Sequence, residues 1–174
     1  KSNKSKPAPQ TLLDVLKEEK RSQVHGGIYH KIQIELTYNS NHIEGSRLTH
    51  DQTRYIFETS TIGVEGDTLR VDDIVETVNH FRCIDIVIDH AEERLTERFI
   101  KELHLRLKAG TSDSLLSWFS VGEYKRLPNE VGGSSTTAPE DVRDEMQALL
   151  KEYNSIQHKS FDDILDLHHR FESI

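Results

Sequence analysis

The sequence lacks the features that several common classes of protein require. Cys83 is the only cysteine, which excludes an internal disulfide or a cysteine-rich zinc site and fits a reducing compartment. The 22 basic residues are outnumbered by 30 acidic ones, and the net charge of −8 disfavours binding to nucleic acid or to an anionic membrane. No apolar run reaches the roughly 18 residues needed to span a bilayer. The composition therefore predicts a soluble cytoplasmic protein that binds neither nucleic acid nor membrane.

Common catalytic and metal-binding motifs are also absent. No G-x-S-x-G, G-x-x-x-x-G-K-[ST] or G-x-G-x-x-G pattern occurs, which removes the usual hydrolase, P-loop and dinucleotide-binding signatures. The ten histidines include no H-E-x-x-H pair, the spacing that places two imidazoles on one helical face, so we predict no metal site. His168 falls on the apolar stripe of its helix and is interpreted as a hydrogen-bonded core histidine.

What the sequence does contain is a series of amphipathic helical patterns. At 174 residues the chain suits one domain or a compact pair. Residues 1–10 are polar and proline-containing and predict a disordered leader, residues 11–70 predict a set of N-terminal helices, and residues 71–174 form the remaining part. Capping residues and apolar spacing place helix starts near Leu12, Tyr29, Thr49, Ile74, Thr96, Pro139 and Ser160.

A stretch from Val121 to Thr137 departs from this helical pattern. It is rich in Gly, Pro, Ser and Thr, which favour turns and loops over helix. We therefore expect a hairpin or an exposed flap at this point. The fold class predicted from the residues is a mainly α helical bundle with one small β element.

The segment S-N-H-I-E-G, residues 40–45, is the one part of the sequence that an ordinary surface role explains poorly. It places Glu44 at the C-terminal end of a predicted helix, followed by a glycine that lets the chain turn sharply. A carboxylate there meets the negative end of the helix dipole, at a cost of a few tenths to about 1 kcal/mol. An arginine is the simplest compensation; the alternative is an ordinary surface carboxylate.

This segment and its flanks resemble the inhibitory motif S/T-x-x-x-E-G/N of the Fic family (filamentation induced by cyclic AMP). Most members of that family transfer AMP from ATP to a protein hydroxyl. The motif precedes the rest of the chain, as in the class whose inhibitory helix lies N-terminal to the Fic core. The resemblance thus implies an inhibitory helix over about 29–44, with Ser40, Glu44 and Gly45 as inhibitory residues.

A second stretch, G-E-Y-K-R-L-P-N-E-V-G-G at residues 122–133, looks like the flap of the same family. That flap is a β-hairpin that holds a target segment by strand addition, a mode that tolerates many target sequences. The resemblance covers nearly all of the chain from about Leu12 and implies a Fic-like helical bundle with a flap over about 121–133. The target-binding residues that it implies are Gly122, Tyr124, Lys125, Leu127 and Val131.

The third stretch, L-H-H-R-F-E-S-I at residues 167–174, is similar to the helix that leads into the catalytic motif H-P-F-x-[DE]-G-N-G-R-x-x-R, and that motif does not occur in the sequence. Its general base, metal ligand, phosphate-binding nest and arginines are missing with it. The resemblance therefore implies an incomplete Fic core over 71–174, no catalytic residue, and exposed apolar surface unless a C-terminal fragment completes the core.

For the complete protein, the resemblance implies an autoinhibited Fic-type adenylyltransferase that uses ATP and Mg²⁺ to modify a Ser, Thr or Tyr hydroxyl of a protein substrate. Glu44 would pair with the second arginine of the motif and keep the γ-phosphate from its productive pose, while Ser40 would hold the helix end. The 174-residue chain alone is expected to be inactive and to bind nucleotide weakly or not at all. The alternative is a non-catalytic helical interaction module. Relatives often form homo-oligomers, and in some the same glutamate assists AMP removal.

Overall fold

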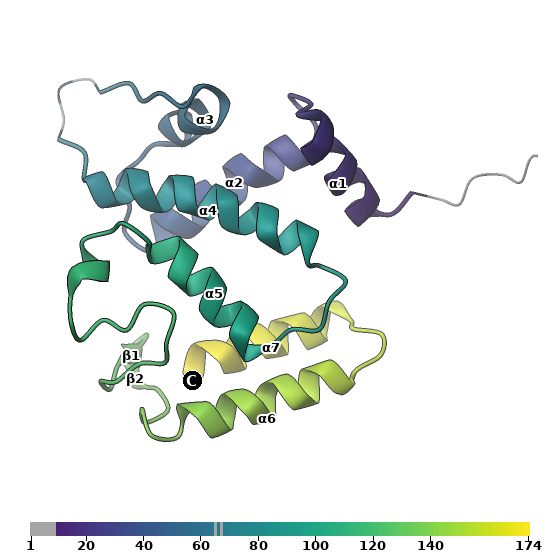
Figure 1. The fold of residues 1–174 in the computed structure, drawn as a ribbon, viewed down its shortest axis with the longest axis vertical. Helices are drawn as coiled ribbons and strands as arrows, with labels where there is room; N and C mark the ends of the chain where they lie inside the picture. Colours follow the sequence, from purple (N-terminus) through teal and green to yellow (C-terminus); the bar gives the residue numbers. More distant parts are fainter. Residues whose placement is uncertain (1–9, 65, 67) are drawn as a thin grey trace, which may run out of the picture. The chain divides into compact units, whose positions relative to one another are not determined.

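We analysed a computed structural model that describes residues 10–64, 66 and 68–174 of the chain (Figure 1). Nine of the ten residues of the predicted disordered leader, 1–9, lie outside the described residues. Within the described part there are seven α-helices, one short 3₁₀ helix and a two-stranded antiparallel hairpin, which confirms the mainly α fold class. No helix in that part is both long and apolar enough to cross a membrane.

The contacts divide the chain into two compact units, one up to Glu92 and the other from Glu93 onward. The first unit contains α1 (Leu12–Ser22), α2 (Ile28–Ile43), α3 (His50–Thr59) and α4 (Val71–Asp89). Helix α2 is its centre and contacts α1, α3 and α4. The boundary that the sequence placed between residues 70 and 71 stays a prediction.

Local sequence explains where these helices begin. Thr11 and Thr49 each form a capping box with the residue three positions on, Asp14 and Gln52, so the free N–H groups of the first turn are bonded. Helix α2 has no such side chain of its own. Instead Glu19 of α1 accepts a hydrogen bond from the backbone N–H of Tyr29, at 2.8 Å, and its carboxylate meets the positive end of the α2 dipole.

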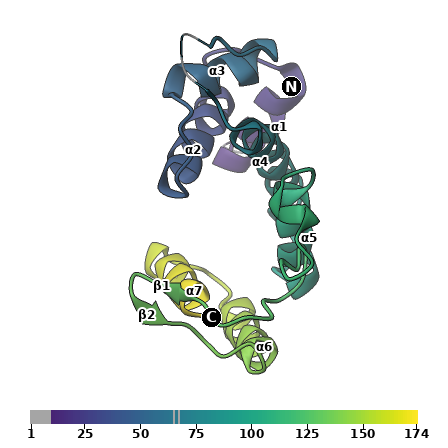
Figure 2. The same ribbon diagram turned by 90° about the vertical axis from the view of Figure 1, so that its left-hand side faces the viewer.

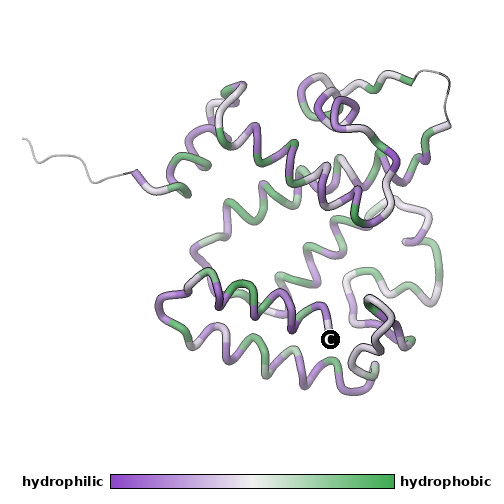
Figure 3. Tube along the Cα trace, turned by 180° about the vertical axis from the view of Figure 1, so that it is seen from behind, coloured by the Kyte–Doolittle hydropathy of each residue, from purple (hydrophilic) through white to green (hydrophobic). Residues whose placement is uncertain are grey.

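Apolar and polar layers both hold the first unit together. The apolar layer consists of two clusters, each extended by partly buried neighbours that include Phe57. Their buried members are Tyr29, Ile84 and Ile88 in one cluster and Leu48, Ile56 and Phe81 in the other. Figure 3 shows hydrophilic and hydrophobic residues alternating along the helices, as an amphipathic bundle requires.

The polar layer, which we call the polar seam, lies between α2 and α4. Four residues spaced by one helical turn along α2 bond to α4: the Tyr29 hydroxyl and Gln33 Nε2 both donate to Asp85 Oδ1, Thr37 bonds to His80, and Asn41 Nδ2 donates to Thr77 Oγ1. The donor–acceptor distances are 2.8, 2.9, 2.8 and 3.0 Å. Buried polar groups bonded in this way fix the register of the two helices, since a shift would leave them unpaired.

The second unit contains α5 (Glu97–Lys108), a 3₁₀ helix (Asp113–Leu115), β1 (Glu130–Val131), β2 (Ser134–Ser135), α6 (Val142–Ser155) and α7 (Phe161–Ser173). Val142, Met146 and Leu150 of α6 form its apolar cluster, with Ile100 and Tyr124 packed against them. Helices α6 and α7 lie side by side, and the hairpin lies near the end of α7 (Figure 2).

Two expectations about the second unit were wrong. Pro139 does not occupy the first turn of α6; it lies in a β-turn closed by a 2.9 Å bond from the Asp141 N–H to the Ala138 carbonyl, a position that the fixed φ of proline suits equally well. His168 is not a core histidine. Its side chain is 67% exposed and contacts Glu172, and α7 as a whole has no fully buried residue.

Candidate functional site

The C-terminal end of α2 forms a sharp turn that places Glu44 at its tip. Gly45 has a φ of 90°, and two bonds close the turn, from the Gly45 N–H to the His42 carbonyl at 3.1 Å and from the Ser46 N–H to the Asn41 carbonyl at 2.9 Å. This is the Schellman arrangement, in which a residue at positive φ satisfies the last helix carbonyls. An added Cβ at Gly45 would meet no atom within 4 Å, so glycine is favoured there by its backbone conformation and not by space.

Both sides of this turn are fixed to α4. Before the turn, Asn41 is bonded to Thr77 in the polar seam, and after it the Arg47 N–H donates to Asp73 Oδ2 at 3.1 Å. Leu48 then enters the apolar cluster of Ile56 and Phe81. The turn is therefore held at a defined place on the first unit, even though its tip is exposed.

Of the three predicted inhibitory residues, Glu44 and Gly45 are exposed and Ser40 is half-buried one turn earlier on α2. No residue in the described part of the chain forms a hydrogen bond or ion pair with the Glu44 carboxylate. No arginine among the described residues therefore pairs with Glu44 to offset its unfavourable contact with the helix dipole. Their inhibitory role stays a prediction.

The hairpin of the second unit overlaps the C-terminal end of the predicted flap, 121–133. Glu130 pairs with Ser135 and Val131 with Ser134, and the two-residue loop between them is Gly132-Gly133, both at positive φ as the tight turns of hairpins demand. Both strands are exposed. The second strand lies just beyond the predicted boundary at residue 133.

The five predicted target-binding residues of the flap separate into two groups. Leu127 and Val131 are exposed, whereas Gly122, Tyr124 and Lys125 bond within the unit. The Tyr124 hydroxyl donates to Glu97, and burial together with this bond raises the pKa of Tyr124. Lys125 Nζ donates to Asn129 Oδ1, to Thr136 and to the Ile174 carbonyl, and burial lowers its pKa. These two side chains brace the hairpin, so contact with a target would come from the other two and from the backbone.

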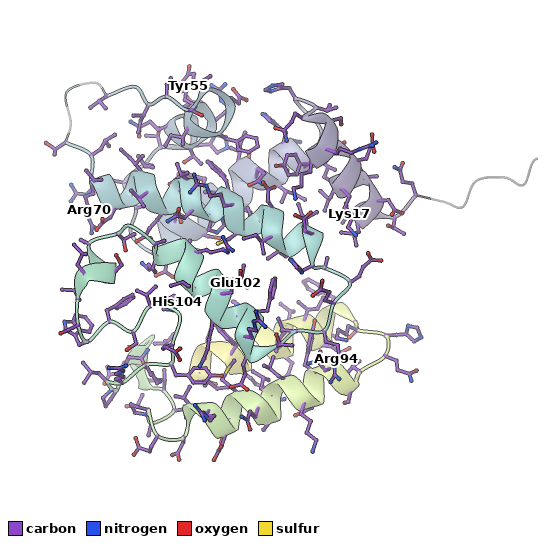
Figure 4. The ribbon with its side chains drawn as sticks, in the orientation of Figure 1. Lys17, Tyr55, Arg70, Arg94, Glu102 and His104 are labelled. Atoms are coloured by element: carbon purple, nitrogen blue, oxygen red, sulfur yellow. The ribbon has the colours of Figure 1, made fainter. Side chains whose placement is uncertain are left out.

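Gly122 at the base of the flap has a steric reason to be glycine. Its φ is 75°, and a Cβ there would lie 3.0 Å from the Leu105 Cβ of α5. The Gly122 N–H donates to Nδ1 of His104, also on α5, at 3.1 Å. His104 is labelled in Figure 4. Burial and the nearby Lys108 lower the pKa of His104, which favours the neutral ring that can accept this bond.

One group of side chains escaped the sequence analysis altogether. His25, His30 and Glu58 lie together in the first unit, and each offers a ligand atom within 4.8 Å of the other two. His30 and Glu58 belong to different helices and are far apart in the sequence, so no local spacing could have revealed them. The H-E-x-x-H pattern finds only ligands that share one helix.

Comparison with known proteins supports the fold predicted from the sequence. No protein-family model and no curated protein matches the chain. A crystal structure of a Fic domain-containing signaling protein from Bacteroides thetaiotaomicron does match, with a TM-score of 0.62 and 28% sequence identity. The match covers 82% of this chain and 55% of that one, so the chain spans about half the length of the protein it resembles. The chain therefore has a Fic-like helical fold.

Proposed function

We propose that this chain is the N-terminal and central part of an autoinhibited Fic-type protein adenylyltransferase. The observation that carries the proposal is the 28% identity to a Fic domain-containing protein over 82% of the chain, combined with Glu44 at the exposed tip of a firmly anchored helix end. The complete protein would transfer AMP from ATP, with Mg²⁺, to a hydroxyl of a protein substrate. The oxygen of that hydroxyl would bond to the α-phosphorus, and pyrophosphate would leave.

Inhibition in this proposal depends on how α2 holds its last residue. A carboxylate that is to capture an arginine of the catalytic motif must be presented in a fixed place, and the polar seam and the Schellman turn supply that rigidity. Pairing with the guanidinium would also relieve the unfavourable contact of Glu44 with the helix dipole. Ser40, half-buried one turn earlier, would steady the same helix end.

In this proposal the hairpin binds the target segment of the protein substrate. A two-stranded sheet has two open edges whose backbone N–H and C=O groups can pair with an extended peptide. Lys125 and Tyr124 hold the base of the hairpin within the unit, which keeps those edges in place. A target could then be held mainly through its backbone, with Leu127 and Val131 contacting its side chains.

The test compares AMP transfer by a longer version of the protein, extended through an H-P-F-x-[DE]-G-N-G-R-x-x-R motif, with that by the 174-residue chain. ATP labelled at the α-phosphate should label target or enzyme only with the longer protein. In the longer protein Glu44→Gly should raise the rate by about tenfold or more, which corresponds to about 1.4 kcal/mol of lost inhibition. Glu145→Gln, an exposed acidic residue on α6, serves as the matched control and should leave the rate unchanged.

Two outcomes would overturn the proposal. Robust AMP labelling by the 174-residue chain would show that the catalytic motif is not needed for AMP transfer. An unchanged rate of AMP transfer in Glu44→Gly would show that Glu44 does not inhibit the enzyme. A gene that ends at Ile174, with no catalytic motif to add, would favour the non-catalytic interaction module instead.

A further inference from the structure

His25, His30 and Glu58 come from three different places in the first unit. His25 lies in the turn between α1 and α2, His30 in the first turn of α2, and Glu58 in the last turn of α3. Their ligand atoms all lie within 4.8 Å of one another, and no other group of three His, Cys, Asp or Glu side chains among the described residues meets this criterion. Imidazole nitrogens and a carboxylate converge here on one small volume.

The buried member of the cluster lacks a satisfactory partner. His30 Nε2 lies 2.9 Å from Glu58 Oε1, but the contact does not have the alignment of a hydrogen bond, and the nitrogen is buried without one. The His30 side chain is 13% exposed and that of Glu58 is 21% exposed. A buried nitrogen with no hydrogen bond is costly and calls for a ligand that would satisfy it, of which an ion is one kind.

Neighbouring side chains orient the cluster from outside. Arg54 Nη1 lies 3.3 Å from Glu58 Oε2, so one carboxylate oxygen is engaged while Oε1 faces His30. The ring of Phe57 lies 5.5 Å from the His30 ring and packs against it. Outer partners of this kind fix ligand orientation in metal sites.

We propose that His25, His30 and Glu58 bind a zinc ion. Two imidazoles and one carboxylate form a nitrogen and oxygen donor set that suits Zn²⁺, whereas Mg²⁺ and Ca²⁺ prefer oxygen donors alone. The fourth tetrahedral position is taken by water. The site fastens the turn before α2 and the end of α3 to the first turn of α2.

The geometry requires only a small adjustment. Zinc ligands at about 2.0–2.2 Å in a tetrahedron lie about 3.4 Å from one another. The present separations of up to 4.8 Å must therefore shorten by about 1.4 Å at most. His25 supplies this movement, because it is exposed and lies in a turn between helices.

The experiment measures Zn²⁺ binding by the full 174-residue chain, without a histidine tag and after treatment with a chelator. Calorimetric titration should show one tight site per chain, and Mg²⁺ should show none. Loss of an outer-shell partner alone typically costs about 10–100-fold in affinity, so His25→Ala and Glu58→Gln should each weaken binding by at least about 100-fold. The matched control is His158→Ala, an exposed histidine of the second unit, which should bind as the parent does.

A spectroscopic measurement separates this site from weak binding at scattered histidines. Co²⁺ substituted for zinc should give the intense visible absorption of tetrahedral coordination in the parent chain and in His158→Ala, and lose it in His25→Ala. His25 is exposed, so that variant should keep the parent's circular dichroism. The proposal is wrong if the parent binds no Zn²⁺, or if His25→Ala, Glu58→Gln and His158→Ala all bind as the parent does. The cluster would then be only a contact between His30 and Glu58 beside an exposed histidine.

Discussion

Helices α2 and α7 differ in amphipathic pattern and in surroundings, because α7 has the more strongly amphipathic sequence and α2 the more buried position. Helix α2 buries Tyr29, Gln33, Ile34, Thr37 and Asn41 against three neighbouring helices, whereas α7 buries no residue. The more amphipathic helix is thus exposed in its unit, and the less amphipathic one lies at the centre of the other. The difference shows that the neighbours of a helix, and not its own periodicity, decide what its apolar face does.

The polar bonds that hold the two helices also differ, being buried at α2 and exposed at α7. Helix α2 is tied to α4 by the polar seam, which is buried and leaves no room for a shift of register. Helix α7 is tied to α6 by Arg170, whose guanidinium lies 3.0 Å from Glu152 at the surface, and this pair lowers the pKa of Glu152. An exposed ion pair contributes only about 0–1 kcal/mol. Helix α7 also leaves apolar side chains exposed, among them Phe161, Leu165 and Phe171.

The largest effect is expected from Tyr29, where both layers of the first unit meet. It is 3% exposed, packs on Ile84 and Ile88, and bonds to Asp85. Tyr29→Ala should lower the free energy of unfolding by about 3–5 kcal/mol, the usual range for loss of a buried aromatic ring. Tyr29→Phe keeps the ring and should cost only about 1–2 kcal/mol for the lost bond. Urea unfolding followed by circular dichroism measures both, and equal losses in the two variants would contradict the packing argument.

An intermediate effect is expected from pH, through one half-buried histidine in each unit. Burial is the main cause that lowers the pKa of His80 and of His104. The unfolded chain therefore takes up these protons first, and stability is lost as the pH falls from about 6.5 toward the lower folded pKa values. Burial also raises the pKa of Tyr29 to about 12, so stability is lost again above about pH 10.

Histidine variants test whether His80 causes the loss of stability at acidic pH. Unfolding by urea at several values between about pH 7.5 and pH 5 should show a shallower decline for His80→Gln than for the parent chain. His168→Gln removes an exposed histidine and is the control, with a profile parallel to the parent's. If the free energy of unfolding falls equally steeply in all three proteins, carboxylates alone cause the loss of stability.

The helix ends that could be predicted have local causes, whereas the predicted start at Pro139 was wrong. The capping boxes at Thr49 and Ser160 and the positive φ at Gly45 depend on residues within a turn of each other. His168 was misplaced because periodicity identifies an apolar face without telling what covers it. The His25, His30 and Glu58 cluster could not be predicted at all, since it depends on how α2 and α3 pair, which no local spacing encodes.

The smallest effect on stability, and the most direct test of the contrast between the two helices, is expected on α7. Phe161 is 72% exposed and Leu165 is 48% exposed, so replacing either with Ser removes little burial and should change the free energy of unfolding by no more than about 0.5 kcal/mol. The hydrophobic dye ANS binds to exposed apolar surface. The double variant Phe161→Ser/Leu165→Ser should therefore bind much less ANS than the parent chain does, although its stability is nearly unchanged. A loss of several kcal/mol instead would mean that these residues are buried in the folded protein in solution, and that α7, like α2, is held by its neighbours.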